Sequence, residues 1–251
     1  MRVLVAIKQV PARDSVLRID SSGRWVEEGD LSFEVNEPDA YALEEALQLK
    51  EQHGGEVVAV CAGPARAASA IREALAKGAD RAVHIEEAGL WRTDVLGVSK
   101  LLAEVARRES PDLILTGIQS DDLGYGQTGV VIAELLGLPH ATIIMQVEKL
   151  EGAVRVKREL EGGWFQHVTL PLPAVLTIQS GIKKLRYATL MGIKKAKTKE
   201  VKTLRSADLG GLAGPVVTME RVYPPHRTKQ TTILRSVAEL VEKLRFEARV
   251  L

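Results

Sequence analysis

The chain has 251 residues, enough to bury a sizeable core, and its 34 Lys and Arg residues against 33 Asp and Glu residues give a net charge of +1 at pH 7. This balance argues against a protein that binds nucleic acid over its whole surface, and it favours small ligands or proteins as partners. The single cysteine, Cys61, excludes an internal disulfide framework, a Cys-ligated zinc site and an iron–sulfur cluster held by this chain alone.

No apolar run approaches the roughly 20 residues that a membrane-spanning helix needs. The first residues, RVLVAIK, read as a strand and not as the apolar part of a signal peptide. A reducing compartment fits the cysteine usage. We therefore expect a cytoplasmic protein without membrane insertion.

Strand and helix patterns alternate through the first half of the chain. Continuous apolar and β-branched runs predict buried parallel strands, and apolar residues at helical spacing between them predict helices. A short hairpin is expected between residues 9 and 33. Four βα units in succession predict an α/β fold with a right-handed, doubly wound and mostly parallel sheet. The predicted strands are residues 3–7, 56–62, 81–85 and 113–116, and the predicted helices are residues 38–53, 65–77, 95–107 and 130–136.

In the second half of the chain, predicted strands follow one another without helices between them. Strands predicted at residues 141–147, 154–157, 168–170 and 174–178, with a hairpin turn at 161–163, add a β section to the same sheet. Beyond Gly181 the pattern decays, apart from one amphipathic helix at residues 233–248. This segment has few apolar anchors, so we expect it to lie against this domain or, preferably, against a partner chain. The predicted division is an α/β domain over residues 1–181 and an extended arm over residues 182–251.

The segment from Leu113 to Gly129, LILTGIQSDDLGYGQTG, is the strongest candidate for a binding site. It reads as strand, glycine-rich loop and helix. Such a connection offers unpaired backbone N–H groups and a helix dipole to a phosphate. Gln127 and Thr128 add side-chain donors. An ordinary βα connection with turn glycines explains the loop about as well when it is considered alone.

Motifs for catalysis are missing from the sequence. The five histidines, including His226, lack the spacing of a metal site and are interpreted as surface or core residues. The absence of GxSxG, of a Walker A sequence and of GxGxxG after the first strand disfavours dehydrogenases and P-loop NTPases. An SGGxDS-like phosphate loop is also missing after that strand. Asp121 and Asp122 could be acids or metal ligands, but carboxylates in a loop before a helix are commonly solvated or capping groups.

Several blocks of sequence, in order and spacing, resemble the β subunit of electron transfer flavoprotein along essentially the whole chain. They are VLVAIKQVPARDSVLRID, NEPDAYALEEALQLKE, AGPARAASAIREALAKGADRAVHI, TGIQSDDLGYGQTG, RYATLMGIKKAK and, most specifically, VKRELEGGWFQHVTLPLPAVLT. The resemblance implies a heterodimer with an α subunit that holds most of one FAD. The pair carries electrons from acyl-CoA and related dehydrogenases, as in fatty acid oxidation, to a membrane quinone reductase. The chain itself is then an electron carrier and not an enzyme.

The resemblance also implies that this subunit binds AMP in a structural role. The topological rule for open α/β sheets predicts that the matching positions meet at the carboxyl ends of the strands. Two alternatives remain: an electron-bifurcating homologue with a second FAD in this site, and a free-standing adenine-nucleotide-binding domain resembling universal stress proteins. The matching cofactor-binding positions are Ala6, Asn36, Glu37, Pro38, Asp39, Ala62, Gly117, Ile118, Gln119, Ser120, Asp121, Asp122, Leu123, Gly124, Tyr125, Gly126, Gln127 and Thr128.

A recognition loop for dehydrogenases is a further implication of the resemblance. Its leucine anchor maps to Leu190, and Lys195 stands where some relatives carry methyl-lysine. The segment from 181 to 205 holds nine Lys or Arg residues and one acidic residue. Positive charge of this kind speeds encounter with acidic partners. The alternative for this segment is a solvated basic arm or a weak nucleic-acid patch.

Three positions depart from the family pattern. Gly126 replaces an asparagine that commonly precedes Gln-Thr-Gly, so one phosphate or ribose contact is expected to be lost or made by the backbone. Glu37 follows Asn36 where many relatives have proline. Arg13 stands where some relatives place an aromatic residue near the flavin.

Overall fold

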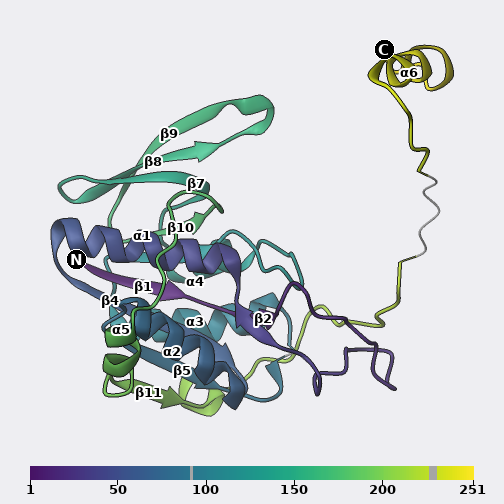
Figure 1. Ribbon diagram of the computed structural model, residues 1–251. Helices are drawn as coiled ribbons and strands as arrows, with labels where there is room; N and C mark the ends of the chain where they lie inside the picture. The colour runs from purple at the N-terminus through teal and green to yellow at the C-terminus, as the bar shows by residue number, and fades with distance from the viewer. Residues whose placement is uncertain (91–92, 226–230) are drawn as a thin grey trace.

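A mixed sheet of nine strands forms the centre of the computed structural model, which describes residues 1–90, 93–225 and 231–251. Helices cover both faces of the sheet, and a small two-stranded sheet lies at one end (Figure 1). The small sheet pairs β2 (Gln9–Pro11) antiparallel with β3 (Phe33–Val35). Between these two strands an antiparallel bridge joins Ile19 to Val26, which confirms the predicted short hairpin in residues 9–33. In spatial order the nine strands are β11 (Val201–Leu204), β5 (Arg81–Glu86), β4 (Glu56–Gly63), β1 (Arg2–Ala6), β6 (Leu113–Gly117), β10 (Ala174–Ile178), β7 (His140–Lys149), β8 (Ala153–Glu159) and β9 (Phe165–Pro171).

The strands from β11 to β7 run parallel to their neighbours, and β8 and β9 continue the sheet as antiparallel strands. Because β1 lies between β4 and β6, the chain adds strands first on one side of β1 and then on the other. This arrangement confirms the predicted doubly wound, mostly parallel sheet with an added β section.

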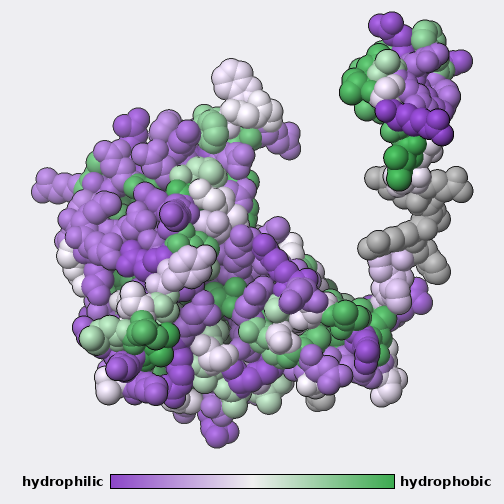
Figure 2. Space-filling view, in the orientation of Figure 1, coloured by the Kyte–Doolittle hydropathy of each residue, from purple (hydrophilic) through white to green (hydrophobic). Residues whose placement is uncertain are grey.

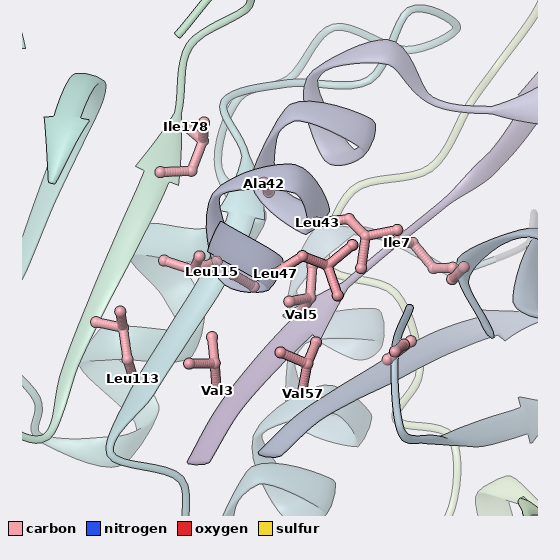
Figure 3. Close-up of a cluster of buried hydrophobic side chains, with 14 of the residues drawn as sticks. Val3, Val5, Ile7, Ala42, Leu43, Leu47, Val57, Leu113, Leu115 and Ile178 are labelled. Atoms are coloured by element: carbon pink, nitrogen blue, oxygen red, sulfur yellow. The ribbon is translucent and has the colours of Figure 1, made fainter. Parts of the chain in front are cut away.

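Side chains of the central strands alternate between two apolar layers. Val3 and Val5 of β1 pack with α1 on one face of the sheet (Figure 3), and Leu4 packs with α3 on the other face. Both faces of these strands are buried, which explains their continuous apolar sequences. The helices of the body are α1 (Glu37–His53), α2 (Ala68–Lys77), α3 (Val95–Glu109), α4 (Thr128–Leu136) and α5 (Leu190–Ala196).

The predicted helix boundaries have local causes. Helix α1 has Pro38 in its first turn and is followed by Gly54, whose φ of +71° suits glycine. At the start of α3 the carboxylate of Asp94 accepts the N–H of Gly97 at 2.9 Å, so the predicted N-cap is confirmed. These residues set where α1 begins and ends and where α3 begins.

The segment after Gly181 begins by packing against the body. The guanidinium of Arg186 binds the carboxylates of Glu44 and Glu51 on α1, with shortest N–O distances of 2.8 and 2.6 Å. Helix α5 packs on α2, and β11 adds a parallel strand beside β5. Neither α5 nor β11 is predicted from the sequence. The predicted division of the chain at residue 181 stays a prediction.

The last part of the chain extends away from the body (Figure 1). The N–H of Val222 donates to the carbonyl of Gly23 at 2.8 Å, so the arm first follows the hairpin between β2 and β3. The predicted helix at residues 233–248 is present in shorter form, as α6 (Val237–Glu242) followed by a π-helical turn (Lys243–Glu247). Within the described ranges, no helix has the length and apolarity to cross a bilayer.

Candidate functional site

The carboxyl ends of β1, β4 and β6 meet where the strand order reverses, and most of the sequence-predicted binding residues come together there. Ala6 ends β1, Ala62 is the second-last residue of β4, and Gly117 ends β6. The first turn of α1 lies against the same edge through the contacts described below. The segment from Gly117 to Thr128, named the glycine loop, passes over this edge and leads into α4.

Asp39 joins the first turn of α1 to two strand ends. Its carboxylate accepts the backbone N–H of Lys8 at 2.8 Å and the N–H of Gly117 at 2.9 Å. Burial raises the pKa of this carboxyl to about 7, although the two N–H groups act in the opposite direction. Both carboxylate oxygens of Asp39 thus accept hydrogen bonds from the backbone of this chain.

Asn36 makes a second connection to the glycine loop. Its Nδ2 donates to the carbonyl of Gln119 at 2.8 Å, and its Oδ1 accepts the N–H of Asp121 at 2.9 Å. The residue is only 1% exposed. Donor and acceptor of the amide are thus both directed at the backbone of the loop.

Two cations bind the loop from the side of the hairpin. Lys8 Nζ lies 2.7 Å from Oδ1 of Asp122, and the guanidinium of Arg13 bridges Glu37 and Asp121. Partial burial raises the pKa of Asp122, but the charge and hydrogen bond of Lys8 outweigh it, so that pKa lies below its usual value. Both loop carboxylates are therefore ion-paired. Lys8 is absent from the predicted site, and its place directly after β1 is the one signal that could have identified it.

The second half of the glycine loop turns through two glycines. The N–H of Gly124 donates to the carbonyl of Ser120 at 2.9 Å, and both Gly124 and Gly126 have positive φ, at +64° and +62°. Helix α4 then begins without a side-chain cap from Gln127 and without an acidic residue in its first turn. Its uncapped end and its dipole suit a phosphate group.

Gly129, in the first turn of α4, fixes that helix against the strand ends. A Cβ at this position would lie 2.5 Å from Cγ2 of Thr177 on β10 and 2.7 Å from Oγ1 of Thr116 on β6. The start of α4 therefore lies directly on the sheet edge, beside the other contacts of the glycine loop.

The charges at this edge suit a nucleotide held mainly by backbone groups. Lys8 and Arg13 are already paired with Asp122, Asp121 and Glu37. The N–H groups and the dipole of α4 would therefore supply most of the attraction for a phosphate. Small residues at the strand ends leave room for close approach of a ligand to the backbone. The donor set thus fits a mononucleotide such as AMP.

The structure offers no competing centre for metal chemistry within the described ranges, where no group of three His, Cys, Asp or Glu side chains is arranged to hold a metal ion. His84 is buried on β5, with its Nε2 3.2 Å from the carbonyl oxygen of Gly63. His226 lies outside the described residues.

The two predicted partner-binding residues lie away from the glycine loop. Leu190 begins α5 and is 82% exposed, and Lys195 is exposed on the same helix. Figure 1 places α5 at the opposite end of the sheet from β2, and Figure 2 shows an apolar patch over α5. Tyr187 and Met191 are also exposed there. Four exposed residues of this kind make a candidate docking surface, named the α5 patch (Tyr187, Leu190, Met191 and Ile193).

Comparisons with known proteins agree on one similarity. Residues 24–209 match the family model described as "Electron transfer flavoprotein domain". The chain is 39% identical over 254 residues to the electron transfer flavoprotein subunit beta of Methylophilus methylotrophus, covering 97% of this chain and 96% of that protein. It is 36% identical over 254 residues to the human subunit beta, covering 100% of this chain and 99% of that protein. It is 38% identical over 259 residues to a mitochondrial subunit beta of Oryza sativa subsp. japonica, with both chains covered completely.

Proposed function

Because the chain belongs to the electron transfer flavoprotein β-subunit family, we propose that it is an electron-carrier subunit that pairs with an α subunit and does not act as an enzyme by itself. The similarity over the full length of the relatives is the observation that carries this proposal. The α subunit holds most of one FAD, and this flavin supplies the redox chemistry. The pair takes electrons from acyl-CoA and related dehydrogenases and passes them to a quinone reductase. A cytoplasmic location remains part of the proposal.

AMP bound at the glycine loop has a structural role in this proposal. The uncapped start of α4 and the glycines of the loop support a phosphate site. A ligand that binds only the folded state at 100 times its dissociation constant stabilises that state by about 2.7 kcal/mol. AMP therefore stabilises the subunit without taking part in electron transfer.

Exposed apolar side chains along the arm are evidence that a partner chain binds there. Ile233 is 91% exposed, and Val237, Leu240 and Phe246 are also exposed on and around α6. Val216 adds a further exposed apolar side chain where the arm leaves the body. Side chains of this kind are covered in a stable complex. The α subunit is the proposed cover.

The proposal is tested by the composition of the purified complex. We would co-express the chain with its α subunit, purify and denature the complex, and quantify the released FAD and AMP by chromatography. One FAD and one AMP per heterodimer support the simple electron carrier. Two FAD and no AMP favour the electron-bifurcating alternative, and failure to form a complex with any α subunit favours the free-standing nucleotide-binding domain.

A further inference from the structure

We propose that Asn36 is a positioning residue, which holds the glycine loop in its ligand-binding shape and does not itself contact the nucleotide. This inference deepens the proposed function and rests on nucleotide binding at the loop. It changes the role that the family resemblance implies for Asn36, which is that of a direct ligand.

The first observation is that both polar atoms of the Asn36 side chain are already used. The amide nitrogen donates to the carbonyl of Gln119 at 2.8 Å, and the amide oxygen accepts the N–H of Asp121 at 2.9 Å. The asparagine amide is neutral and can donate a hydrogen bond from its nitrogen while accepting one on its oxygen, which is what these two contacts require. At 1% exposure the group has no open face for a ligand.

The second observation is that the Asn36 side chain does not cap α1, although Asn36 stands at the N-cap position. It is the N-cap residue of α1, where an asparagine side chain normally accepts a backbone N–H from the first turn, yet it makes no such bond. Pro38 and the acidic residues Glu37 and Asp39 favour the helix start instead. Helix capping therefore does not account for an asparagine here, whereas the two bonds to the loop do.

The two bonds fix the backbone on either side of Ser120. Lys8 holds the same stretch through Ser120 and Asp122, so the loop is fastened before it turns at Gly124 toward α4. A loop that is already ordered loses less conformational entropy when it binds a ligand. Asn36 therefore raises nucleotide affinity through the loop.

The test compares three variants as full-length chains in the heterodimer, freed of nucleotide. Asn36→Ala removes both bonds to the loop and also the hydrogen bond that Asn36 makes to the Asp39 carboxylate, and Asn36→Asp keeps the acceptor but loses the donor unless the new carboxyl is protonated. Ile71→Val, on the buried face of α2, is a control that lowers stability without touching the loop. AMP affinity is measured by calorimetry, and amide hydrogen exchange of the glycine loop is measured before AMP is added.

Asn36→Ala should bind AMP about tenfold or more weakly, because two buried hydrogen bonds are lost. Its glycine loop should exchange amide hydrogens faster in the AMP-free protein, while the exchange of β1 and β6 is unchanged. Ile71→Val should match the wild type in both measurements. An Asn36→Ala loop that exchanges as slowly as in the wild type would overturn the proposal.

The pH profile separates positioning from general loss of structure. A protonated Asp at position 36 can again donate to Gln119, so the AMP affinity of Asn36→Asp should approach that of the wild type as the pH is lowered. Asn36→Ala should show no such recovery, because alanine cannot donate to Gln119 at any pH; losing the Asn36 hydrogen bond to Asp39 raises the pKa of that carboxyl further and gives no donor to the loop. Parallel profiles for the two variants would contradict the proposal. The charged groups around position 36 are Lys8, Arg13, Glu37, Asp39, Asp121 and Asp122.

AMP binding by the wild-type protein distinguishes failure of the proposed function from failure of this inference. If wild-type protein does not bind AMP, the proposed nucleotide site and the ligand-binding role of Asn36 both fail. Faster amide hydrogen exchange of the glycine loop in Asn36→Ala would then show only that Asn36 orders the loop. Weak AMP binding by Asn36→Ala together with wild-type loop exchange would instead make Asn36 a direct ligand.

Discussion

Oδ1 of Asp39 accepts the backbone N–H of Gly117 at 2.9 Å, and a Cβ on residue 117 would lie 2.4 Å from that same oxygen. The added atom would also lie 2.7 Å from the backbone nitrogen of Asp39 and from the carbonyl carbon of Pro38. The first turn of α1 and the last residue of β6 therefore fit each other only when residue 117 is glycine. This contact sets the position of the glycine loop at the edge of the sheet.

Replacing Gly117 by Ala should separate α1 from β6. Two of the three clashing atoms belong to the backbone and cannot rotate away. We expect the free energy of unfolding to fall by about 1–3 kcal/mol and AMP affinity to fall with it. Urea unfolding followed by circular dichroism, together with AMP calorimetry, measures both effects. Gly29→Ala is the control, because a Cβ at residue 29 meets nothing within 4 Å; equal behaviour of the two variants would contradict the prediction.

The buried carboxyl of Glu45 should make stability fall as the pH rises. Burial raises its pKa from 4.5 to about 7, and Lys183, 3.8 Å away, offsets this only in part. Between these two pH values the folded chain keeps a proton that the unfolded chain has lost. In Glu45→Gln this dependence is absent. From pH 4.5 to about pH 8 the free energy of unfolding of the variant should rise relative to wild type by up to about 3 kcal/mol.

Glu51→Gln gives a control of opposite sign. The hydrogen bond from Arg186 holds the pKa of Glu51 below its usual value, so this carboxylate stabilises the folded state above its unfolded pKa. Relative to wild type, Glu51→Gln should lose stability at neutral pH and regain it as the pH falls. Both variants are followed by urea unfolding across the pH range. If the wild-type and Glu45→Gln curves run parallel, Glu45 does not titrate as described.

Hydrophobic patterns predict the body of the fold because its elements bury regular faces. The apolar runs of β1, β4 and β6 are covered on both sides, so each appears in the sequence as a strand. Strand β11 has mostly exposed side chains and gives no such pattern. Helix α5 directs Leu190 and Ile193 to solvent, so its apolar residues do not mark a buried face. Backbone pairing with β5 and close packing on α2 place these two elements.

The sequence places the glycine loop at the correct edge of the sheet but does not reveal what holds it. The chain is strand, glycine-rich loop and helix at this point, and the order of strands brings Asn36 and Asp39 to the same edge. Their hydrogen bonds to the glycine loop join residues 78 to 85 positions apart. A local pattern contains no information on such partners. It also cannot distinguish a side chain that binds a ligand from one that binds the loop.

Leu190→Ala should slow electron transfer from an acyl-CoA or related dehydrogenase and leave flavin content intact. Leu190 is 82% exposed, so its removal leaves no cavity in the fold. An exposed leucine at the centre of an apolar patch is a candidate hot spot, and its loss should raise the KM for the dehydrogenase on the order of tenfold. Steady-state reduction of the heterodimer at varied dehydrogenase concentration measures this effect.

Leu150→Ala is the matched control for Leu190→Ala. Leu150 is also exposed, but it follows β7 and lies outside the α5 patch. It should leave both KM and flavin content unchanged. Loss of flavin from Leu190→Ala with an unchanged KM would assign the α5 patch to subunit assembly instead of dehydrogenase docking.

Helix α6 should contribute to binding of the α subunit through its apolar side. Val237, Leu240 and Val241 follow helical spacing and are all exposed. Leu240→Asp places a charge on this side, and a charge buried without a partner weakens an interface strongly. We expect at least a tenfold weaker association of the two subunits, which corresponds to about 1.4 kcal/mol. Glu242→Gln, on the opposite side of the helix, should not change the association. Sedimentation velocity of the purified heterodimer at decreasing concentration measures the dissociation constants, and equal values for the two variants would show that α6 does not take part in the interface.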